Sequence, residues 1–223
     1  MTQEKTIGLG VSLPGTVDRR GRVIRANSLG WQDYSLAEEL GRLLPFPVEI
    51  NNEANCAALG ERWKGTGARA DDLCYIAIGQ GVGSAIICDG ELIYGAACRA
   101  GEIGYLLGEI DQEMSNRNVL GEPGVMERKI WSTLTSCGLN LEQMFQAYVQ
   151  GKEPARGAVT YFIRDLARVI ANIASMLNPE VVVIGGIVAQ YMKPVLPDIR
   201  AVVGVLTPIP TRVELGSLGP WAA

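Results

Sequence analysis

The sequence predicts a mixed α/β fold, and two kinds of pattern within its 223 residues carry that prediction. Short runs of apolar and β-branched residues have the length of buried strands and are bounded by glycine, proline or asparagine turns. Longer segments between them repeat apolar residues with the period of a helix. The clearest helix is expected over 158–177. Asn178-Pro179 ends it and leads into a strand over 181–184, which we expect to be central and parallel.

The first part of the chain is expected to alternate strands and helices. The predicted elements are strands over 7–13, 22–26 and 48–50 and helices over 35–44 and 54–63. Pro14-Gly15 stops the first strand. Ser35 and Glu38 have the spacing of a capping box at the start of the first helix, and Gly65 ends the second.

The second part is expected to begin with three strands and to continue with helices. The predicted elements are strands over 73–78, 83–88, 91–94 and 212–215 and helices over 126–134 and 140–150. Asp89-Gly90 is a strong hairpin signal, because both residue types tolerate positive φ. Residues 109–122 are the most polar and least periodic stretch, and we interpret them as a loop.

Composition argues against several classes of function. With a net charge of −4, nothing in the sequence is basic enough to indicate a nucleic-acid surface, and the longest apolar run is too short to span a membrane. The chain has no histidine, which removes Ser–His and Cys–His mechanisms. The five cysteines are dispersed, which argues against zinc and predicts reduced, buried thiols. Together with a polar start that has no signal region, they predict a cytoplasmic protein.

Two glycine-rich turns follow predicted strands. Gly79-Gln80-Gly81-Val82-Gly83 has the form of a phosphate-binding loop, because glycines let backbone N–H groups approach a phosphate. A tight hairpin explains the same pattern, and for this motif alone we favour the hairpin. Gly185-Gly186 either meets a nucleotide or is only a turn. Neither motif matches the dinucleotide fingerprint that opens a helix.

Three carboxylates at element junctions, Glu53, Glu102 and Glu127, are candidate ligand contacts together with Asn52. A carboxylate accepts hydrogen bonds and each sugar hydroxyl donates one, so the set suits a polyol. Each acid alone is better explained by the preference of acids for helix N-termini. The four residues together favour a site. For Glu53, three roles stay open: general base, ligand clamp or first-turn acid.

Six motifs in a fixed order give the chain a family resemblance. They are Pro14-Gly15-x-Val17-Asp18, Asn27-x-Leu29-Gly30-Trp31, Asn52-Glu53-Ala54-Asn55-x-Ala57-Ala58-Leu59-Gly60-Glu61, Gly79-Gln80-Gly81-Val82-Gly83, Ala100-Gly101-Glu102-Ile103-Gly104 and Val183-Ile184-Gly185-Gly186. This series resembles the ROK family (repressors, open reading frames and sugar kinases) of the actin-like ATPase superfold, a ribonuclease H-like two-lobe fold. The resemblance spans nearly the whole chain.

The resemblance implies two α/β lobes with sugar and nucleotide in the cleft between them. It makes 1–70 the remainder of an incomplete N-terminal lobe and 71–223 a C-terminal lobe with dimerisation and nucleotide-side elements. The implied substrate contacts are Asn27, Asn52, Glu53, Glu102, Tyr105 and Glu127, with position 53 that of the catalytic base. The implied contacts to ATP, with its magnesium, are Gly79, Gln80, Gly81, Gly83, Gly185 and Gly186.

The chain departs from the family pattern at several points. Glu53 stands where kinases of the family carry Asp, and a misplacement of about 1 Å costs about 10²-fold in rate. Gln80 replaces a threonine of the phosphate loop. Tyr105 replaces a histidine and either contacts the sugar or only packs, and the zinc-binding cysteines are absent, so no zinc is expected. The family's first phosphate loop should lie N-terminal to the strand over 7–13 and is not in this sequence, and the end, 218–223, stops before an expected last helix. We therefore expect a fragment or a truncated product.

These departures leave two hypotheses. We favour the sugar-binding region of a ROK transcriptional regulator, with a monosaccharide in the interlobe cleft, Glu53 as a ligand clamp and DNA bound only through a domain outside this chain. The alternative is an ATP-dependent, glucokinase-like sugar kinase with Glu53 as general base. The chain as given is expected to be inactive in either case. A homodimer is expected, because helix 158–177 and an incomplete lobe leave apolar surface to cover.

Overall fold

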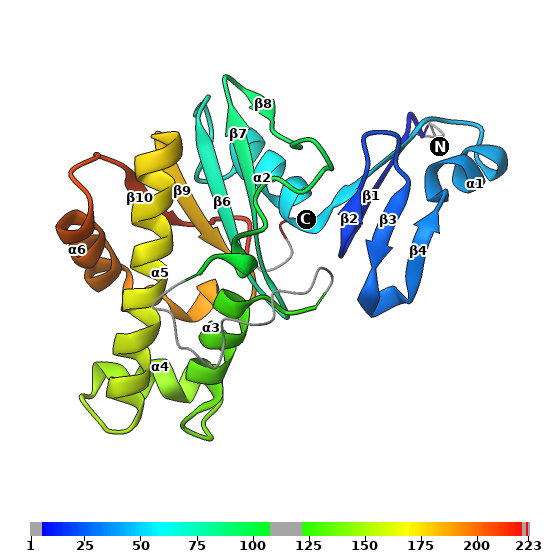
Figure 1. Ribbon diagram of the computed structural model, residues 1–223. Helices are drawn as coiled ribbons and strands as arrows, with labels where there is room; N and C mark the ends of the chain where they lie inside the picture. Colours follow the sequence, from blue (N-terminus) through cyan, green and yellow to red (C-terminus); the bar gives the residue numbers. More distant parts are fainter. Residues whose placement is uncertain (1–5, 108–121, 220–221, 223) are drawn as a thin grey trace, which may run out of the picture.

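The computed structural model describes residues 6–107, 122–219 and 222. Residues up to Asn52 form a small unit, which stands beside a larger unit formed by the rest (Figure 1). The elements of the small unit are β1 (Leu9–Leu13), β2 (Thr16–Val17), β3 (Val23–Ala26), the 3-10 turn η1 (Asn27–Leu29), β4 (Trp31–Tyr34), α1 (Leu36–Leu43) and β5 (Val48–Asn52). Of these, β2 and β4 are not among the predicted strands.

The small unit contains two small sheets. β1 and β5 form a parallel pair in which Leu13 lies opposite Asn52, and β2, β3 and β4 form an antiparallel sheet. Its buried core consists of Leu13, Val17, Val23, Ala26, Leu36 and Ile50. The predicted capping box at Ser35 is wrong. Ser35 precedes α1 but makes no side-chain cap, since its ψ of 61° departs from the extended conformation that an N-cap residue adopts.

The larger unit is built on a five-stranded sheet in the order β10-β9-β6-β7-β8. Its elements are α2 (Glu53–Lys64), β6 (Leu73–Ile78), β7 (Val82–Cys88), β8 (Glu91–Leu92), η2 (Ile103–Tyr105), α3 (Val125–Thr135), α4 (Leu141–Val149), α5 (Ala155–Leu177), β9 (Val181–Gly185), η3 (Ala189–Tyr191), α6 (Leu196–Leu206) and β10 (Arg212–Leu215). β9 pairs in parallel with both neighbours, which confirms the predicted central strand. Asp89 and Gly90 both have positive φ, which confirms the predicted hairpin turn.

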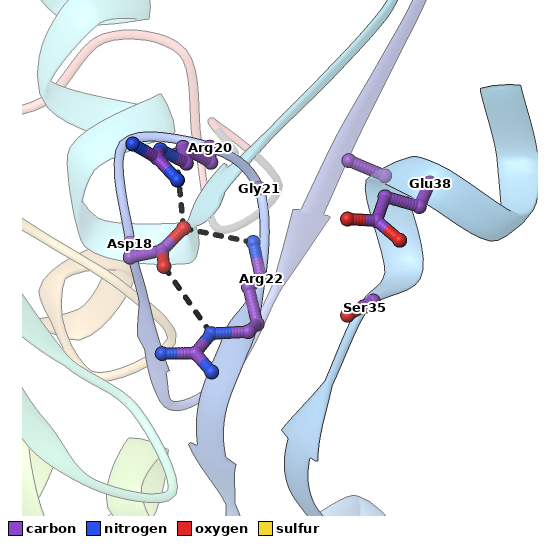
Figure 2. A pocket seen from close by; sticks show the side chains of 7 residues that line it. Asp18, Arg20, Gly21, Arg22, Ser35 and Glu38 are labelled. Carbon is purple, nitrogen blue, oxygen red and sulfur yellow. Dashed lines mark hydrogen bonds and ion pairs between the residues drawn. The ribbon is translucent and has the colours of Figure 1, made fainter.

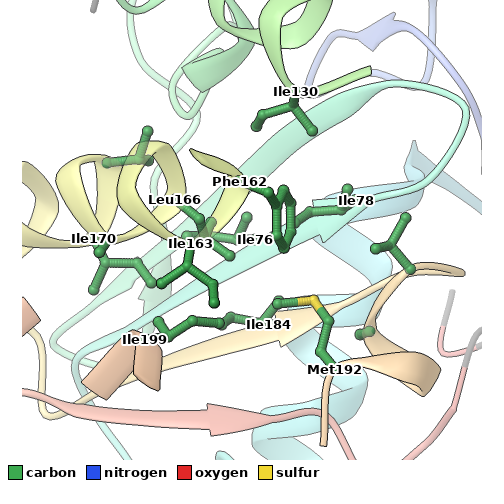
Figure 3. Packing of buried hydrophobic residues seen from close by; sticks show 14 of the residues in the cluster. Ile76, Ile78, Ile130, Phe162, Ile163, Leu166, Ile170, Ile184, Met192 and Ile199 are labelled. Carbon is green, nitrogen blue, oxygen red and sulfur yellow. The ribbon is translucent and has the colours of Figure 1, made fainter. Parts of the chain in front are cut away.

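Helices cover both faces of this sheet. Ile76 and Ile184 point to one face, where they pack against α3, α5 and α6, whereas Tyr75 and Val183 point to the other face, against α2. The first layer is the larger. Figure 3 shows four apolar side chains of α5 over the strands, Phe162, Ile163, Leu166 and Ile170. Ile130 of α3 and Ile199 of α6 lie in the same layer.

The apolar face predicted on the long helix is correct except for its last turn. Its buried residues include Val159 and Ile173, but Met176 is 80% exposed and Leu177 is 40% exposed. The periodic pattern therefore continues beyond the part of the helix that packs on the sheet. Asn178, in the left-handed conformation, ends α5 as predicted.

Three further predictions need correction or fall outside the structure. α6 is not among the predicted helices, because its β-branched valines and Gly204 have weak helix propensity, which packing against α5 overrides. Only Cys74 is buried, whereas Cys88 is exposed and the other three thiols are partly exposed. The predicted loop 109–122 lies outside the described residues apart from its last position.

A fully buried carboxylate, Glu61 of α2, connects this helix to the end of the sheet. It accepts hydrogen bonds from the backbone N–H groups of Thr66 at 2.7 Å and Leu218 at 2.9 Å. Gly65 and Gly216 make room for it, because a Cβ at either would lie 1.9 or 2.7 Å from a carboxylate oxygen. Glu61 therefore fixes the C-terminal end of α2. Within the described residues, no helix has the length and apolar content needed to cross a membrane.

Two neighbouring residues of α5 provide a test of this packing. Phe162→Ala is expected to lower the free energy of unfolding by about 3–5 kcal/mol, because Phe162 is fully buried and the substitution leaves a cavity. Tyr161→Ala is the matched control. Tyr161 is 63% exposed, so the change should stay within about 0.5 kcal/mol. Urea unfolding of both variants makes the measurement, and equal losses would contradict the described packing.

Candidate ligand-binding site

The two glycine-rich turns lie at the same edge of the five-stranded sheet. β6 and β9 are parallel, with Ala77 opposite Gly185, so both strands end at this edge. The turn after β6 is closed by a hydrogen bond from Gly79 N to Gly81 O at 2.9 Å. The turn after β9 is joined to β6 by a hydrogen bond from Val188 N to Ile78 O at 3.1 Å. Open α/β sheets bind ligands at this edge.

Packing alone requires glycine at both positions of the Gly185-Gly186 turn. A Cβ at Gly185 would lie 1.9 Å from the hydroxyl oxygen of Tyr75. Gly186 has a φ of +83°, and a Cβ there would lie 2.6 Å from Ile78 O. The turn therefore has a structural reason for its glycines, and its predicted contact with a nucleotide stays a prediction.

The N-terminus of α2 carries two of the predicted site residues, Asn52 and Glu53. Asn52 is the N-cap: its side-chain oxygen accepts from the backbone N–H groups of Ala54 at 2.8 Å and Asn55 at 3.4 Å. Its amide nitrogen donates to Gly15 O at 2.6 Å, in the loop after β1. Capping therefore accounts for much of the hydrogen bonding of Asn52, while Glu53 projects from the first turn of α2.

The direction of α2 places Glu53 towards the edge that carries the glycine turns. Arg62, near the other end of α2, donates from Nε to Ala70 O at 2.9 Å, just before β6 begins. The head of the helix consequently lies towards the end of β6. Glu53 is close enough to Tyr75 for its charge to raise the pKa of that hydroxyl, and the hydroxyl lies against the Gly185-Gly186 turn.

The other two predicted acids, Glu102 and Glu127, meet at this edge. A Cβ at Gly81 would lie 3.4 Å from one carboxylate oxygen of Glu127, and a Cβ at Gly104 would lie 3.2 Å from the other. Glu127 therefore lies between the turn after β6 and the η2 turn that follows Glu102. The two carboxylates are close enough for their charges to interact.

Partial burial raises the pKa of all three acids. For Glu53 it is the whole cause, and for Glu102 the charge of Glu127 adds to it while Arg99 opposes it. For Glu127, burial outweighs the backbone N–H groups of Gly124 and Val82, which lower the pKa. Among the described residues none of the three acids forms an ion pair. Glu53 and Glu102 are partly shielded from water but keep enough exposed surface for a ligand to reach them.

Tyr105, Asn27 and Gln80 complete the predicted set. Tyr105 donates its hydroxyl proton to Glu122 O at 3.1 Å, which supports its packing alternative. Asn27 is exposed in η1, and Gln80 is exposed at the tip of the turn after β6. In the described part of the chain, no group of three or more metal-binding side chains is placed to hold an ion.

Two hollows lie away from these acids. One, of about 370 Å³, is lined by Asp18, Arg20, Gly21, Arg22, Ser35, Ala37 and Glu38 (Figure 2). Burial opposes ionisation of Asp18, but hydrogen bonds from the backbone N–H groups of Arg22 and Arg20 and from the Arg22 guanidinium outweigh it and lower the pKa, so this carboxylate already has its partners. The other, of about 390 Å³, lies between α4 and η3 and includes Phe145 and Tyr191. Neither contains a predicted site residue.

Sequence reasoning missed the structural roles of Asn51 and Asn55. Asn51 Oδ1 accepts from Asn55 Nδ2 at 2.8 Å and from Asn52 N at 2.9 Å. The spacing of four residues between the two asparagines is a signal for such a contact at the head of a helix. The hydrogen bond between Asn51 and Asn55 therefore orders the start of α2, where Glu53 lies.

Comparison with known proteins gives consistent matches. The sequence pattern of the ROK family matches residues 1–206. A xylose repressor of Caldicellulosiruptor bescii is 30% identical over 91% of this chain and 55% of its own length. A glucokinase of Halalkalibacterium halodurans is 31% identical over 87% of this chain and 65% of its own length. The chain thus spans less than two thirds of either relative.

A solved structure matches nearly all of the chain. It is a ROK family glucokinase from Streptomyces griseus in complex with glucose and AMPPNP, with a TM-score of 0.78 at 23% identity. The match covers 99% of this chain and 80% of that one. The predicted α/β fold of the actin-like ATPase superfold is therefore confirmed.

The raised pKa values lead to a prediction about stability. A carboxyl whose pKa is higher in the folded than in the unfolded state contributes stability below its unfolded pKa, and loses it as the pH rises through the folded pKa. Glu102→Gln removes this loss. Between about pH 4 and pH 7 the variant should therefore gain stability relative to the wild type. Urea unfolding across this range measures the gain, with Glu49→Gln, an exposed acid on β5, as control. A difference that does not change with pH would contradict the prediction.

Proposed function

Because this chain belongs to the ROK family, we propose that it is the sugar-binding region of a ROK transcriptional regulator. The observation that carries the proposal is a group of three acids, Glu53, Glu102 and Glu127, that form no ion pair with any described residue and lie on elements that converge at the edge where β6 and β9 end. Such acceptors suit the hydroxyl groups of a monosaccharide. A neutral polyol supplies hydrogen-bond donors to these acceptors without bringing a charge into the site.

The proposed contacts follow the same geometry. Glu102 and Glu127 accept sugar hydroxyls from the side of the larger unit, and Glu53 clamps the sugar from the head of α2. Asn52 contributes through the second hydrogen of its amide, since its oxygen caps the helix. Tyr105 is a weaker member of the set, because its hydroxyl already donates to Glu122 O. Asn27, exposed in η1, is the other weaker member.

Position 53 favours a regulator over a kinase. The resemblance places the kinase base at this position as Asp, and Glu53 carries the carboxylate one methylene further out. General base catalysis requires the carboxylate within hydrogen-bond reach of the attacking hydroxyl, at roughly 2.6–3.2 Å. A clamp tolerates the displacement, because it needs only an acceptor and transfers no proton. The similarity to a xylose repressor supports this reading.

A sugar kinase is the second candidate, supported by the similarity to a glucokinase and by the intact glycine turns. In that case Gly79, Gln80, Gly81 and Gly83 would meet the phosphates of ATP with its magnesium, and Gly185 and Gly186 the adenosine. Gln80 is exposed at the tip of its turn, where it can reach a phosphate, but it lacks the hydroxyl of the family's threonine. Pairing into a homodimer and DNA binding through another domain also remain proposals.

Sugar titration is the direct test of the proposal. Calorimetry with a panel of glucose, mannose, N-acetylglucosamine, N-acetylmannosamine, xylose and fructose should find one monosaccharide that binds. Glu102→Ala should weaken that binding at least about tenfold, because it removes a charged hydrogen-bond acceptor. Glu49→Ala, which removes an exposed acid on β5, should leave it unchanged. Silence across the panel from folded protein would count against the proposal.

Nucleotide separates the two candidates. If the chain is a sensor, Mg-ATP should leave the sugar affinity unchanged and no sugar phosphate should form in a coupled assay. Efficient phosphorylation by the wild type would overturn the regulator reading and make Glu53 the base. Glu53→Gln should then lower kcat by at least about 10²-fold with little change in KM, as expected for a general base.

A further inference from the structure

Tyr94, just after β8, receives two contacts from the small unit. Its hydroxyl accepts a hydrogen bond from Asn51 Nδ2 at 3.0 Å. The guanidinium carbon of Arg19, in the loop between β2 and β3, lies 5.1 Å from the centre of its ring, within cation–π range. Asn51 lies in β5, directly before Asn52 and Glu53. Two residues of the small unit, Asn51 and Arg19, thus hold the side chain of Tyr94, which belongs to the larger unit.

The direction of the hydrogen bond to Tyr94 is fixed by its neighbours. Asn51 Oδ1 accepts from the backbone N–H of Asn52 at 2.9 Å, and a backbone N–H can only donate. The oxygen of the Asn51 amide therefore faces Asn52, and its NH₂ group faces Tyr94. Asn55 Nδ2 donates to the same oxygen and strengthens the assignment. Tyr94 is consequently the acceptor in this bond.

Tyr94 is also tied to the side of the site that carries Glu102. Its carbonyl accepts a hydrogen bond from Ala100 N at 3.0 Å, which closes the loop before Gly101. The carbonyl of Gly101 in turn accepts from both the backbone N–H and the hydroxyl of Ser84, at 3.0 and 2.8 Å. The segment from Tyr94 to Glu102 is therefore anchored on β7.

We propose that Tyr94 is a positioning residue that holds the Glu53 side and the Glu102 side of the sugar site at a fixed separation. Asn51 connects its hydroxyl to the head of α2, and the loop that it closes leads to Glu102. A sugar that contacts both sides binds tightly only if they are already the right distance apart, since ordering them on binding costs affinity. The inference rests on the proposed sugar-binding function.

The test is calorimetric titration of the chain with the same sugar panel: glucose, mannose, N-acetylglucosamine, N-acetylmannosamine, xylose and fructose. Tyr94→Phe keeps the ring and its contact with Arg19 but removes the hydroxyl. We expect sugar affinity to fall about 3- to 10-fold, the effect of one hydrogen bond. Tyr161→Phe on α5 is the matched control, because Tyr161 is 63% exposed and is not one of the residues that form the site or the bridge. It should bind like the wild type.

Asn51→Asp distinguishes positioning from a mere structural defect. Asp keeps the oxygen that accepts from Asn52 N–H, and its second oxygen accepts a hydrogen bond from the Tyr94 hydroxyl, so the bridge survives with its direction reversed. Affinity should stay within about twofold of the wild type. Adding Tyr94→Phe to this variant should lower it again, and Asn51→Leu, which cannot form the bridge, should lower it alone. The Asn51 variants keep the test decisive if Tyr94→Phe does not fold.

The outcomes separate the two levels of the argument. Equal affinity of Tyr94→Phe and the wild type would overturn the positioning role alone. Weakened binding by Asn51→Asp would also overturn it, because the bridge that this variant keeps would then not be what maintains the affinity. No binding by the folded wild type overturns the proposed function, and the positioning role with it.

Discussion

The parallel register of β9 with β6 determines where every other part of the site lies. It sets Ala77 opposite Gly185 and so brings two turns that are far apart in the sequence to the same edge. A slip of one residue would turn Ile184 from the α5 side to the α2 side of the sheet. Such a slip is prevented because both faces are buried under different helices. The position of the glycine turns is thus a consequence of core packing.

The helix α2 connects the sheet to the small unit, because it packs on the sheet and directly follows β5. Its C-terminal end is anchored by the buried Glu61, which binds backbone N–H groups from two segments. Its head is ordered by Asn51 and Asn52, whose amide NH₂ groups also donate hydrogen bonds to the Tyr94 hydroxyl and to Gly15 O. A helix fixed at both ends holds the backbone of Glu53, in its first turn, in a defined place. Partial burial of Glu53 and Glu102 raises their pKa values and costs stability, which the packed sheet offsets. Perturbed pKa values of this kind are typical of binding and catalytic sites.

The sequence predicts those parts of the fold that depend on local chemistry. Asp89-Gly90, Gly65 and Asn178 mark turns and helix ends correctly, because positive φ and the absence of a Cβ act within a few residues. The sequence fails where tertiary contacts decide. α6 contains valines that favour strands, and Ser35 has the spacing of a cap without its conformation. The bond between Asn51 and Tyr94 joins residues 43 positions apart, and no local pattern indicates it.

The two candidate functions share one half of the site and differ in the other. Both need acids that receive sugar hydroxyls, so Glu102 and Glu127 are expected under either. The raised pKa of Glu53 moves it towards the range that a general base needs. Its longer side chain has the opposite effect, since phosphoryl transfer depends mainly on positioning and a base that is displaced loses more than a favourable pKa restores. Position therefore outweighs pKa at residue 53, and a clamp without chemistry is the function that requires no compensating shift of α2.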